Sequence, residues 1–179
     1  MAMSIQTSVS VAPLEGYAGT LDTAYPHTLI TARSSESSAS IPFGKAVVWD
    51  PSTPTHDRDV TLPTGETDSV MGIVVHNHNF ARAWIDSAGT THGELDATGL
   101  RPGTIFSVLR KGRILVTAAT ATVAGVSKLW VRAVAGLGET LGALEDADDS
   151  TDMIDCTTKG TWMSTVAAGE LAWLEVDFV

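Results

Sequence analysis

The sequence has little cysteine, and this shortage excludes two kinds of stabilising site. Cys156 is the single cysteine among 179 residues, so the chain cannot form an internal disulfide or a cysteine-based zinc site. The surrounding residues 153–157 contain no basic side chain that would lower the pKa of the thiol. We therefore expect Cys156 to be a buried, inert side chain rather than a nucleophile.

Long apolar runs are also missing. Residues 70–75 and 171–174 form apolar runs that fall far below the ~20 residues that a membrane-spanning helix needs. The first eleven residues carry neither the basic cluster nor the apolar stretch of a signal peptide. We expect a soluble protein that is made in the cytoplasm and has no membrane partner.

Basic residues are few, which argues against a nucleic-acid partner. Eleven Lys and Arg residues stand against 21 Asp and Glu residues, giving a net charge of −10 at pH 7. The largest basic cluster is Arg110, Lys111 and Arg113. A nucleic-acid binder needs a positive face to neutralise phosphates, so this chain would be repelled. The acidity suits a protein that stays soluble at high concentration or meets a basic surface.

Helical periodicity is nearly absent, whereas strand patterns recur along the chain between Gly, Pro, Asn and Asp. The last pattern alternates, with Ala172, Leu174, Val176 and Phe178 on one face. Many short strands with regular turns predict an all-β fold, either a sandwich or a barrel. The strands are expected near residues 28–32, 46–49, 70–77, 81–85, 104–109, 113–117, 129–134, 161–165 and 171–178.

Two connecting segments carry local predictions of their own. Residues 110–113 read as a tight hairpin in which Gly112 has a positive φ. Residues 138–148 contain Leu141 and Leu144 at helical spacing, but Gly142 interrupts them, which predicts a short helix or a loop.

The first forty residues differ from the rest. Residues 34–40 are rich in serine, and Gly16, Gly19 and Pro26 break regular structure. Such a segment cannot bury enough surface to offset the entropy of ordering it. It is therefore a floppy leader or an extended N-terminal arm that orders against a partner, and we predict an arm over 1–40 and a β-sandwich or jelly-roll-like barrel over 41–179.

Candidate metal sites are weak. His76 and His78 would face the same side of a strand and could reach one ion, with His92 or Asp86 as a third ligand, but we favour the simpler interpretation that two polar residues close the strand. The acidic stretch 145–155 lacks the glycine and bidentate glutamate of a calcium loop, so a solvated acidic loop is favoured. We predict no metal.

Catalytic patterns are missing as well. The sequence contains no G-x-S-x-G nucleophile motif and no glycine-rich phosphate loop, so we predict neither catalysis nor a cofactor. The tryptophans suit packing in a core or a subunit interface better than stacking on sugars or bases. They are Trp49, Trp84, Trp130, Trp162 and Trp173.

Several stretches, taken in order, resemble one family. Residues 16–22 (GYAGTLD) resemble the G-[YF]-x-G-x-L-[AD] motif of tailed-phage structural cement proteins, also called capsid decoration proteins. Further similarities span nearly the whole chain: IPFGKAVV at 41–48, TLP at 61–63 with MGIVVH at 71–76, VLRKGRILV at 108–116 and AGELAWLEV at 168–176.

The resemblance implies a β-sandwich or jelly-roll-like barrel that sits on the outer surface of the virion capsid, and a chain made in the host cytoplasm. It implies binding to the major capsid protein at junctions between its subunits, as a homo-oligomer with a trimer favoured over a dimer. Such a protein would stabilise the assembled head against internal DNA pressure.

An aromatic residue beside Gly or Pro, in a segment too polar to fold alone, is a natural anchor for a partner's pocket. The capsid-contact candidates are Tyr17, Leu21, Pro42 and Phe43. Phe43 could instead plug the end of its own barrel. Two other functions compete: a glycan-binding module on the virion, using an exposed Trp84 or Trp162, and a tail or baseplate component.

Overall fold

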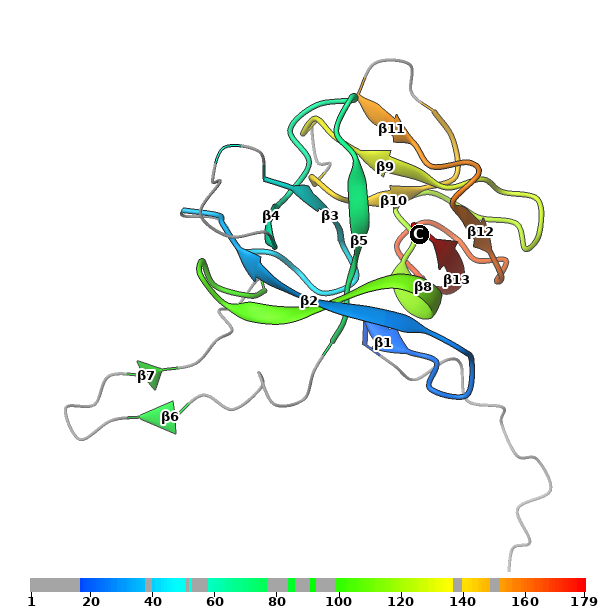
Figure 1. Ribbon diagram of the computed structural model, residues 1–179. Helices are drawn as coiled ribbons and strands as arrows, with labels where there is room; N and C mark the ends of the chain where they lie inside the picture. Colours follow the sequence, from blue (N-terminus) through cyan, green and yellow to red (C-terminus); the bar gives the residue numbers. More distant parts are fainter. Residues whose placement is uncertain are drawn as a thin grey trace, which may run out of the picture.

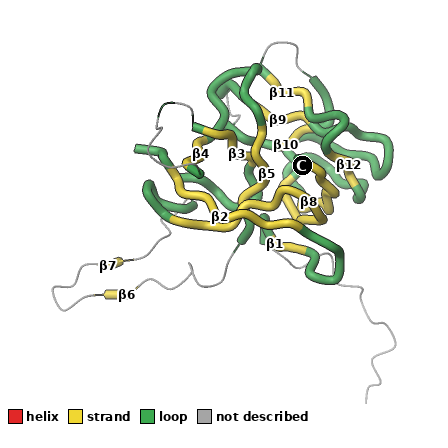
Figure 2. The backbone as a smooth tube through the Cα atoms, viewed as in Figure 1, coloured by secondary structure: helices red, strands yellow, loops and turns green. Residues whose placement is uncertain are grey.

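One long strand, β8 (Ile105–Thr117), organises the computed structural model and pairs along both of its edges (Figure 1). The structure describes residues 17–37, 40–50, 52, 58–76, 84–85, 91–92, 99–136, 140–148 and 152–179. All regular elements among these residues are strands, and none is a helix (Figure 2). The all-β prediction is therefore confirmed.

The first half of β8 closes a barrel. It pairs antiparallel with β2 (Thr28–Ser34), which pairs in parallel with β4 (Asp59–Thr61). The ring continues through β3 (Ala46–Trp49) to β5 (Val70–Val74), which returns to the other edge of β8. The barrel in the prediction is confirmed, and its jelly-roll form stays a prediction.

The second half of β8 leaves the barrel and supports a further layer. It pairs with β13 (Leu171–Asp177), which pairs with β12 (Gly160–Trp162), and on the opposite edge with β1 (Thr20–Leu21). A separate sheet has the order β10 (Leu144–Glu145), β9 (Trp130–Arg132), β11 (Met153–Asp155). The strands β6 (Trp84–Ile85) and β7 (Thr91–His92) form a two-stranded sheet.

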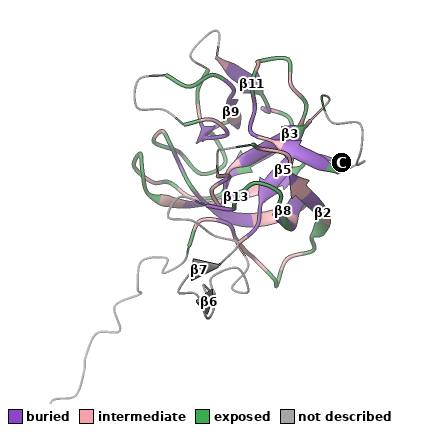
Figure 3. Cartoon of the chain, turned by 90° about the vertical axis from the view of Figure 1, so that its left-hand side faces the viewer, coloured by how far each residue is buried: buried purple, intermediate pink, exposed green. Residues whose placement is uncertain are grey.

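The barrel strands bury side chains on both faces, which explains why they read as continuous apolar runs. The buried side chains form two clusters. Val47 belongs to the smaller one, which we call the barrel cluster, whereas its neighbours Ala46 and Val48 belong to the larger cluster. Val74 belongs to the barrel cluster and Ile73 to the larger cluster in the same way. Accordingly, Figure 3 shows β3 and β5 coloured mostly as buried. The larger cluster also contains residues of β9 to β13, so it lies between the outside of the barrel and the added layers.

The predicted hairpin at 110–113 is wrong, because these residues belong to the continuous strand β8 and do not form a turn. Gly112 does have a positive φ, of 133°, but it pairs in register with Val176 rather than turning the chain. A Cβ on Gly112 would lie 2.8 Å from the Cβ of His27. Glycine is therefore needed here for the close crossing of the segment between β1 and β2.

Two further expectations concern single segments. Within the predicted arm over 1–40, β1 and β2 both pair with β8, while residues 1–16 lie outside the described part of the chain, and the arm itself stays a prediction. The sequence predicts a strand near 28–32 but not its partner, because β8 lies far along the chain. Among the described residues of 138–148, the chain forms turns and β10 instead of a helix.

Candidate functional site

Three rings from distant parts of the chain meet at one place. The Tyr17 ring stacks on the His76 ring, with centroids 5.5 Å apart and an interplanar angle of 16°. The Phe43 ring meets His76 edge-on, with centroids 4.6 Å apart and an angle of 64°. Tyr17 is 69% exposed, whereas Phe43 and His76 are half-buried. We call these three side chains the aromatic cluster.

The backbone beneath the aromatic cluster is held by hydrogen bonds between the three segments. The Gly19 N–H donates to the Leu115 carbonyl over 2.7 Å, and the His76 N–H donates to the Gly19 carbonyl over 2.8 Å. The Gly44 N–H donates to the Val74 carbonyl over 2.9 Å. The segments that carry the three rings are thus anchored to β5 and β8.

Two glycines make this close approach possible. Gly19 has a φ of +88° and Gly44 a φ of +74°, a region that L side chains rarely adopt. A Cβ on Gly19 would lie 2.7 Å from the backbone nitrogen of His76, and one on Gly44 would lie 3.0 Å from the backbone nitrogen of Gly19. The glycines that flank Tyr17 and Phe43 in the sequence are therefore required by the packing of these segments on each other.

The four predicted contact residues fall into different environments. Tyr17 and Phe43 come together through His76, and Phe43 also packs against the barrel cluster, as the alternative interpretation expected. Leu21 lies in β1, half-buried, and packs against the larger cluster. Pro42 is half-buried beside Ile41, which bridges to Leu100.

The metal interpretations find no support in the described residues. No group of three His, Cys, Asp or Glu side chains that could hold an ion occurs within the described ranges. His76 belongs to the aromatic cluster, a role that sequence reasoning missed, and His78 lies outside the described residues. The sequence places His76 just after an apolar strand but carries no signal that the rings of Tyr17 and Phe43 meet it there.

The acidic stretch is not wholly solvated, which corrects that expectation. Glu145 is 4% exposed and forms a two-bond ion pair with Arg132, which is 1% exposed. Lys45 lies close by, donating to the Thr140 hydroxyl over 2.7 Å, and burial lowers its pKa although Glu145 acts in the opposite direction. This charged group connects the start of β3 to the sheet of β9 and β10.

A second charged group fastens the segment between β1 and β2 to β8 and β13. Glu175 accepts one hydrogen bond from the Tyr25 hydroxyl and one from Arg113, both over 2.9 Å. The Arg113 guanidinium lies 3.9 Å from the centre of the Tyr25 ring. Burial opposes the ionisation of Glu175, but the two hydrogen bonds outweigh it and lower its pKa.

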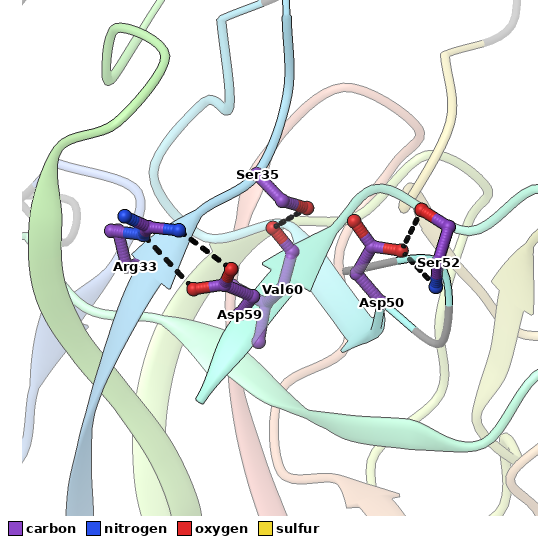
Figure 4. A network of polar contacts seen from close by, with 6 residues as sticks. All are labelled: Arg33, Ser35, Asp50, Ser52, Asp59 and Val60. Carbon is purple, nitrogen blue, oxygen red and sulfur yellow. Dashed lines mark hydrogen bonds and ion pairs between the residues drawn. The ribbon is translucent and has the colours of Figure 1, made fainter. Parts of the chain in front are cut away.

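Figure 4 shows a polar network on the barrel where β2, β4 and β3 meet. Arg33 donates two hydrogen bonds to the buried Asp59, over 2.9 and 2.7 Å. The backbone N–H and the hydroxyl of Ser52 both donate to Asp50. The network holds the parallel pair of β2 and β4, which has only a short register.

Two single residues settle other expectations. Cys156 is buried, and burial raises the pKa of its thiol to about 12, in agreement with an inert side chain. Trp162 is fully buried and its indole N–H donates to the Lys128 carbonyl, so it cannot be an exposed platform for sugars. The side chain of Trp84 lies outside the described residues.

The fold and the aromatic cluster define an all-β barrel protein that carries an exposed tyrosine stacked on a histidine at its surface. The sequence matches the family described as structural cement protein (E217 gp24/Pam3 gp6) over residues 5–177. Because this match covers nearly the whole chain, the protein belongs to the structural cement protein family. Membership implies a structural, capsid-stabilising role in a bacteriophage rather than an enzymatic one.

The other comparisons concern fold and curated relatives. A chain from the capsid of Myoviridae phage XM1 has the same fold, with a TM-score of 0.63 and 14% sequence identity, and the match covers 99% of this chain and 100% of that chain. No curated protein matches the sequence. Within the described residues, no helix has the length and apolar character needed to cross a membrane.

Proposed function

We propose that this cement protein binds the outer surface of the assembled head, at junctions between major capsid protein subunits. There it stabilises the shell against internal DNA pressure. The contact residues are Tyr17, Leu21, Pro42 and Phe43, with Tyr17 as the principal anchor. A ligand that binds only the assembled shell stabilises it by mass action at every occupied site, and many sites acting together multiply the effect.

The aromatic cluster is the observation that carries this proposal. A tyrosine ring that is 69% exposed has no role in the core, yet Tyr17 is stacked on His76 above a rigid backbone joint. A ring that is held in place before binding loses little conformational entropy when it enters a partner's pocket. Leu21 and Pro42 belong to the same two segments as Tyr17 and Phe43 and extend the contact.

An exposed apolar turn supports the expectation of a homo-oligomer, with a trimer favoured over a dimer. Val123 is 49% exposed, Val126 69% and the nearby Met163 41%. The turn is fixed, because the Gly125 N–H donates to the Trp162 carbonyl over 2.7 Å and the Val123 N–H donates to the Ser127 hydroxyl over 2.8 Å. A rigid apolar turn of this kind fits a contact between copies arranged around a symmetry axis.

The test uses phage heads that assembled without the protein. Purified protein added to such heads should restore resistance to heat and low salt, while heads without it still assemble. The Tyr17→Ala variant should show reduced occupancy at an unchanged melting temperature of the free protein. Ile105→Ala, which removes another exposed apolar side chain (60% exposed) in β8, is the matched control and should bind normally. Full occupancy by Tyr17→Ala would show that the principal anchor lies elsewhere.

A further inference from the structure

Two cavities adjoin on the barrel where β3 ends, and the side chains of Trp49 and Asp68 line both of them. One cavity of about 300 Å³ also contains Glu36, and the other, of about 240 Å³, also contains Arg110. We call the two cavities together the Trp49 groove. Its position and its side chains are separate from the aromatic cluster.

The larger cavity carries negative charge without a cation in its wall. The Glu36 carboxylate accepts from the Thr61 hydroxyl over 2.6 Å and from the Leu62 N–H over 2.9 Å. The Asp68 carboxylate accepts from the Thr64 and Gly65 N–H groups over 2.8 and 3.0 Å. These bonds fix the two carboxylates, but neither forms an ion pair with a described residue.

Trp49 adds an independent feature to this cavity. It follows the buried Val47 and Val48 in β3 but is itself 40% exposed, so a large indole surface lies beside the carboxylates. The face of an indole attracts cations, and Trp is the most effective aromatic residue in this respect. An indole together with two fixed carboxylates suits the ammonium of a lysine or the guanidinium of an arginine.

The smaller cavity suits a negatively charged group instead. Arg110 donates from Nη2 to the Phe178 carbonyl, but its Nε–H is buried and has no hydrogen-bond partner. Arg110 forms no ion pair with a described carboxylate, so the part of its guanidinium that lines this cavity can still pair with an acidic side chain of a partner. Lys159 in the same wall is exposed, and its side chain forms no hydrogen bond or ion pair with a described residue. Asp155, also in this wall, already accepts from the Thr157 N–H over 2.8 Å.

We propose that the Trp49 groove binds an extended segment of the capsid shell protein that carries one basic and one acidic side chain. The basic group lies on Trp49 between Glu36 and Asp68, and the carboxylate reaches Arg110. A neutral sugar would leave the charges at both ends unpaired. A second copy of this chain is not the occupant, because the proposed contact between copies is the exposed apolar turn of Val123 and Val126, and neither residue lines the groove. The choice of the shell as the source of this segment rests on the proposed function.

The experiment measures binding to cement-free heads at increasing NaCl concentration, using three variants. In Glu36→Gln/Asp68→Asn, the amide oxygens keep the bonds to the Thr61, Leu62, Thr64 and Gly65 donors while both charges are lost. Trp49→Ala removes the indole surface. The control is Glu66→Gln, which removes an exposed carboxylate from the same loop as Asp68 but outside the cavity wall.

We expect the double variant and Trp49→Ala each to bind heads about tenfold more weakly, a change that corresponds to the loss of one good contact. The double variant should also lose most of the salt dependence of the wild type. Glu66→Gln should behave as the wild type. Unchanged melting temperatures establish that the variants remain folded.

Equal affinity and equal salt dependence of the double variant and the wild type would overturn the inference. So would a lower mass of the free double variant in light scattering, which would assign the groove to a second copy. The inference would also be overturned if the wild type were retained on immobilised neutral oligosaccharide and the groove variants were not, because the groove would then bind a sugar. If the wild type itself fails to bind heads, the proposed function is wrong. If only Tyr17→Ala binds weakly and the groove variants bind as the wild type does, the proposed function stands and the inference about the groove is wrong.

Discussion

Arg132 and Glu145 form a two-bond ion pair that is almost fully removed from solvent, with Nε to Oε1 and Nη2 to Oε2 distances of 3.0 Å each. The pair connects neighbouring strands β9 and β10, in which Glu145 pairs with Trp130 and Leu144 with Val131. Both charges depend on each other, because an ion without its partner at this depth has little access to water.

We predict that Glu145→Ala lowers the free energy of unfolding by about 3–5 kcal/mol, since it removes the carboxylate that accepts two hydrogen bonds from the buried Arg132 guanidinium. Urea unfolding at neutral pH measures the change. The exposed pair of Lys111 and Asp177 is the matched control, and Asp177→Ala should have little effect. Equal effects of the two variants would contradict this account of burial.

How much of the fold could be predicted from the sequence depends on whether the residues that interact lie near one another in the chain. The strands predicted at 46–49 and 70–77 match β3 and, over its first five residues, β5, because both faces of these strands are buried and nearly every residue in them is apolar. The predicted hairpin at Gly112 was wrong because a glycine with a positive φ can serve either a turn or a close crossing of two segments. Glu145 reads as one acidic residue among several, and only the fold brings Arg132 against it.

The candidate site shows the same division. The glycines around Tyr17 and Phe43 marked both segments as unusual, and Tyr17 and Phe43 were predicted from that pattern. The contact with His76 could not be predicted, because residues 17, 43 and 76 meet only after the barrel has closed. Likewise, a strand was predicted at 28–32, where β2 lies, but the sequence alone does not show that this strand pairs with β8.

Gly19 allows a test of the backbone joint beneath the aromatic cluster. Gly19→Ala should destabilise the protein, because it combines an unfavourable φ of +88° with a Cβ only 2.7 Å from the backbone nitrogen of His76. Gly169→Ala is the control: its φ is +84°, but no atom lies within 4 Å of the added Cβ. We expect the control to lose about 1–2 kcal/mol from the backbone conformation alone and Gly19→Ala to lose clearly more. Thermal unfolding of both variants measures the difference, and equal losses would contradict the close packing.

The charged group on β13 predicts how stability depends on pH. The hydrogen bond from Lys111 lowers the pKa of Asp177, and the bonds from Tyr25 and Arg113 lower that of Glu175 against the opposing effect of burial. Both carboxyls therefore ionise more readily in the folded than in the unfolded chain. Their contribution is present above the unfolded values of roughly 4 and is lost as the pH falls through the lower folded values.

Urea unfolding from pH 7 to pH 3 tests this dependence. The wild type should lose stability at the acidic end, and Glu175→Gln/Asp177→Asn should show a flatter curve there, because it lacks the two titrating groups. A curve of the same steepness in the variant would assign the acid sensitivity to other carboxyls.

Cys156 should be unreactive in the folded protein. Burial raises the pKa of its thiol to about 12, so almost no thiolate is present at pH 8, and the side chain is only 3% exposed. We expect no reaction with a thiol-specific disulfide reagent under native conditions and one equivalent of reaction in urea. Rapid labelling of the native protein would show that the thiol is accessible.

Phe43 separates the two roles that the aromatic cluster combines. Its ring contacts His76 on one side and the barrel cluster on the other, so Phe43→Ala should lower both stability and capsid occupancy. Since Phe43 is half-buried, the loss of stability should be roughly half of the 3–5 kcal/mol that truncation of a buried Phe costs. Tyr17→Ala, by contrast, should lower occupancy alone, because its exposed ring contributes little to folding. Melting temperatures and binding to cement-free heads, measured side by side, distinguish the two. If Phe43→Ala lost stability but kept full occupancy at a temperature where it remains folded, Phe43 would only close the barrel, and the anchor would be Tyr17 by itself.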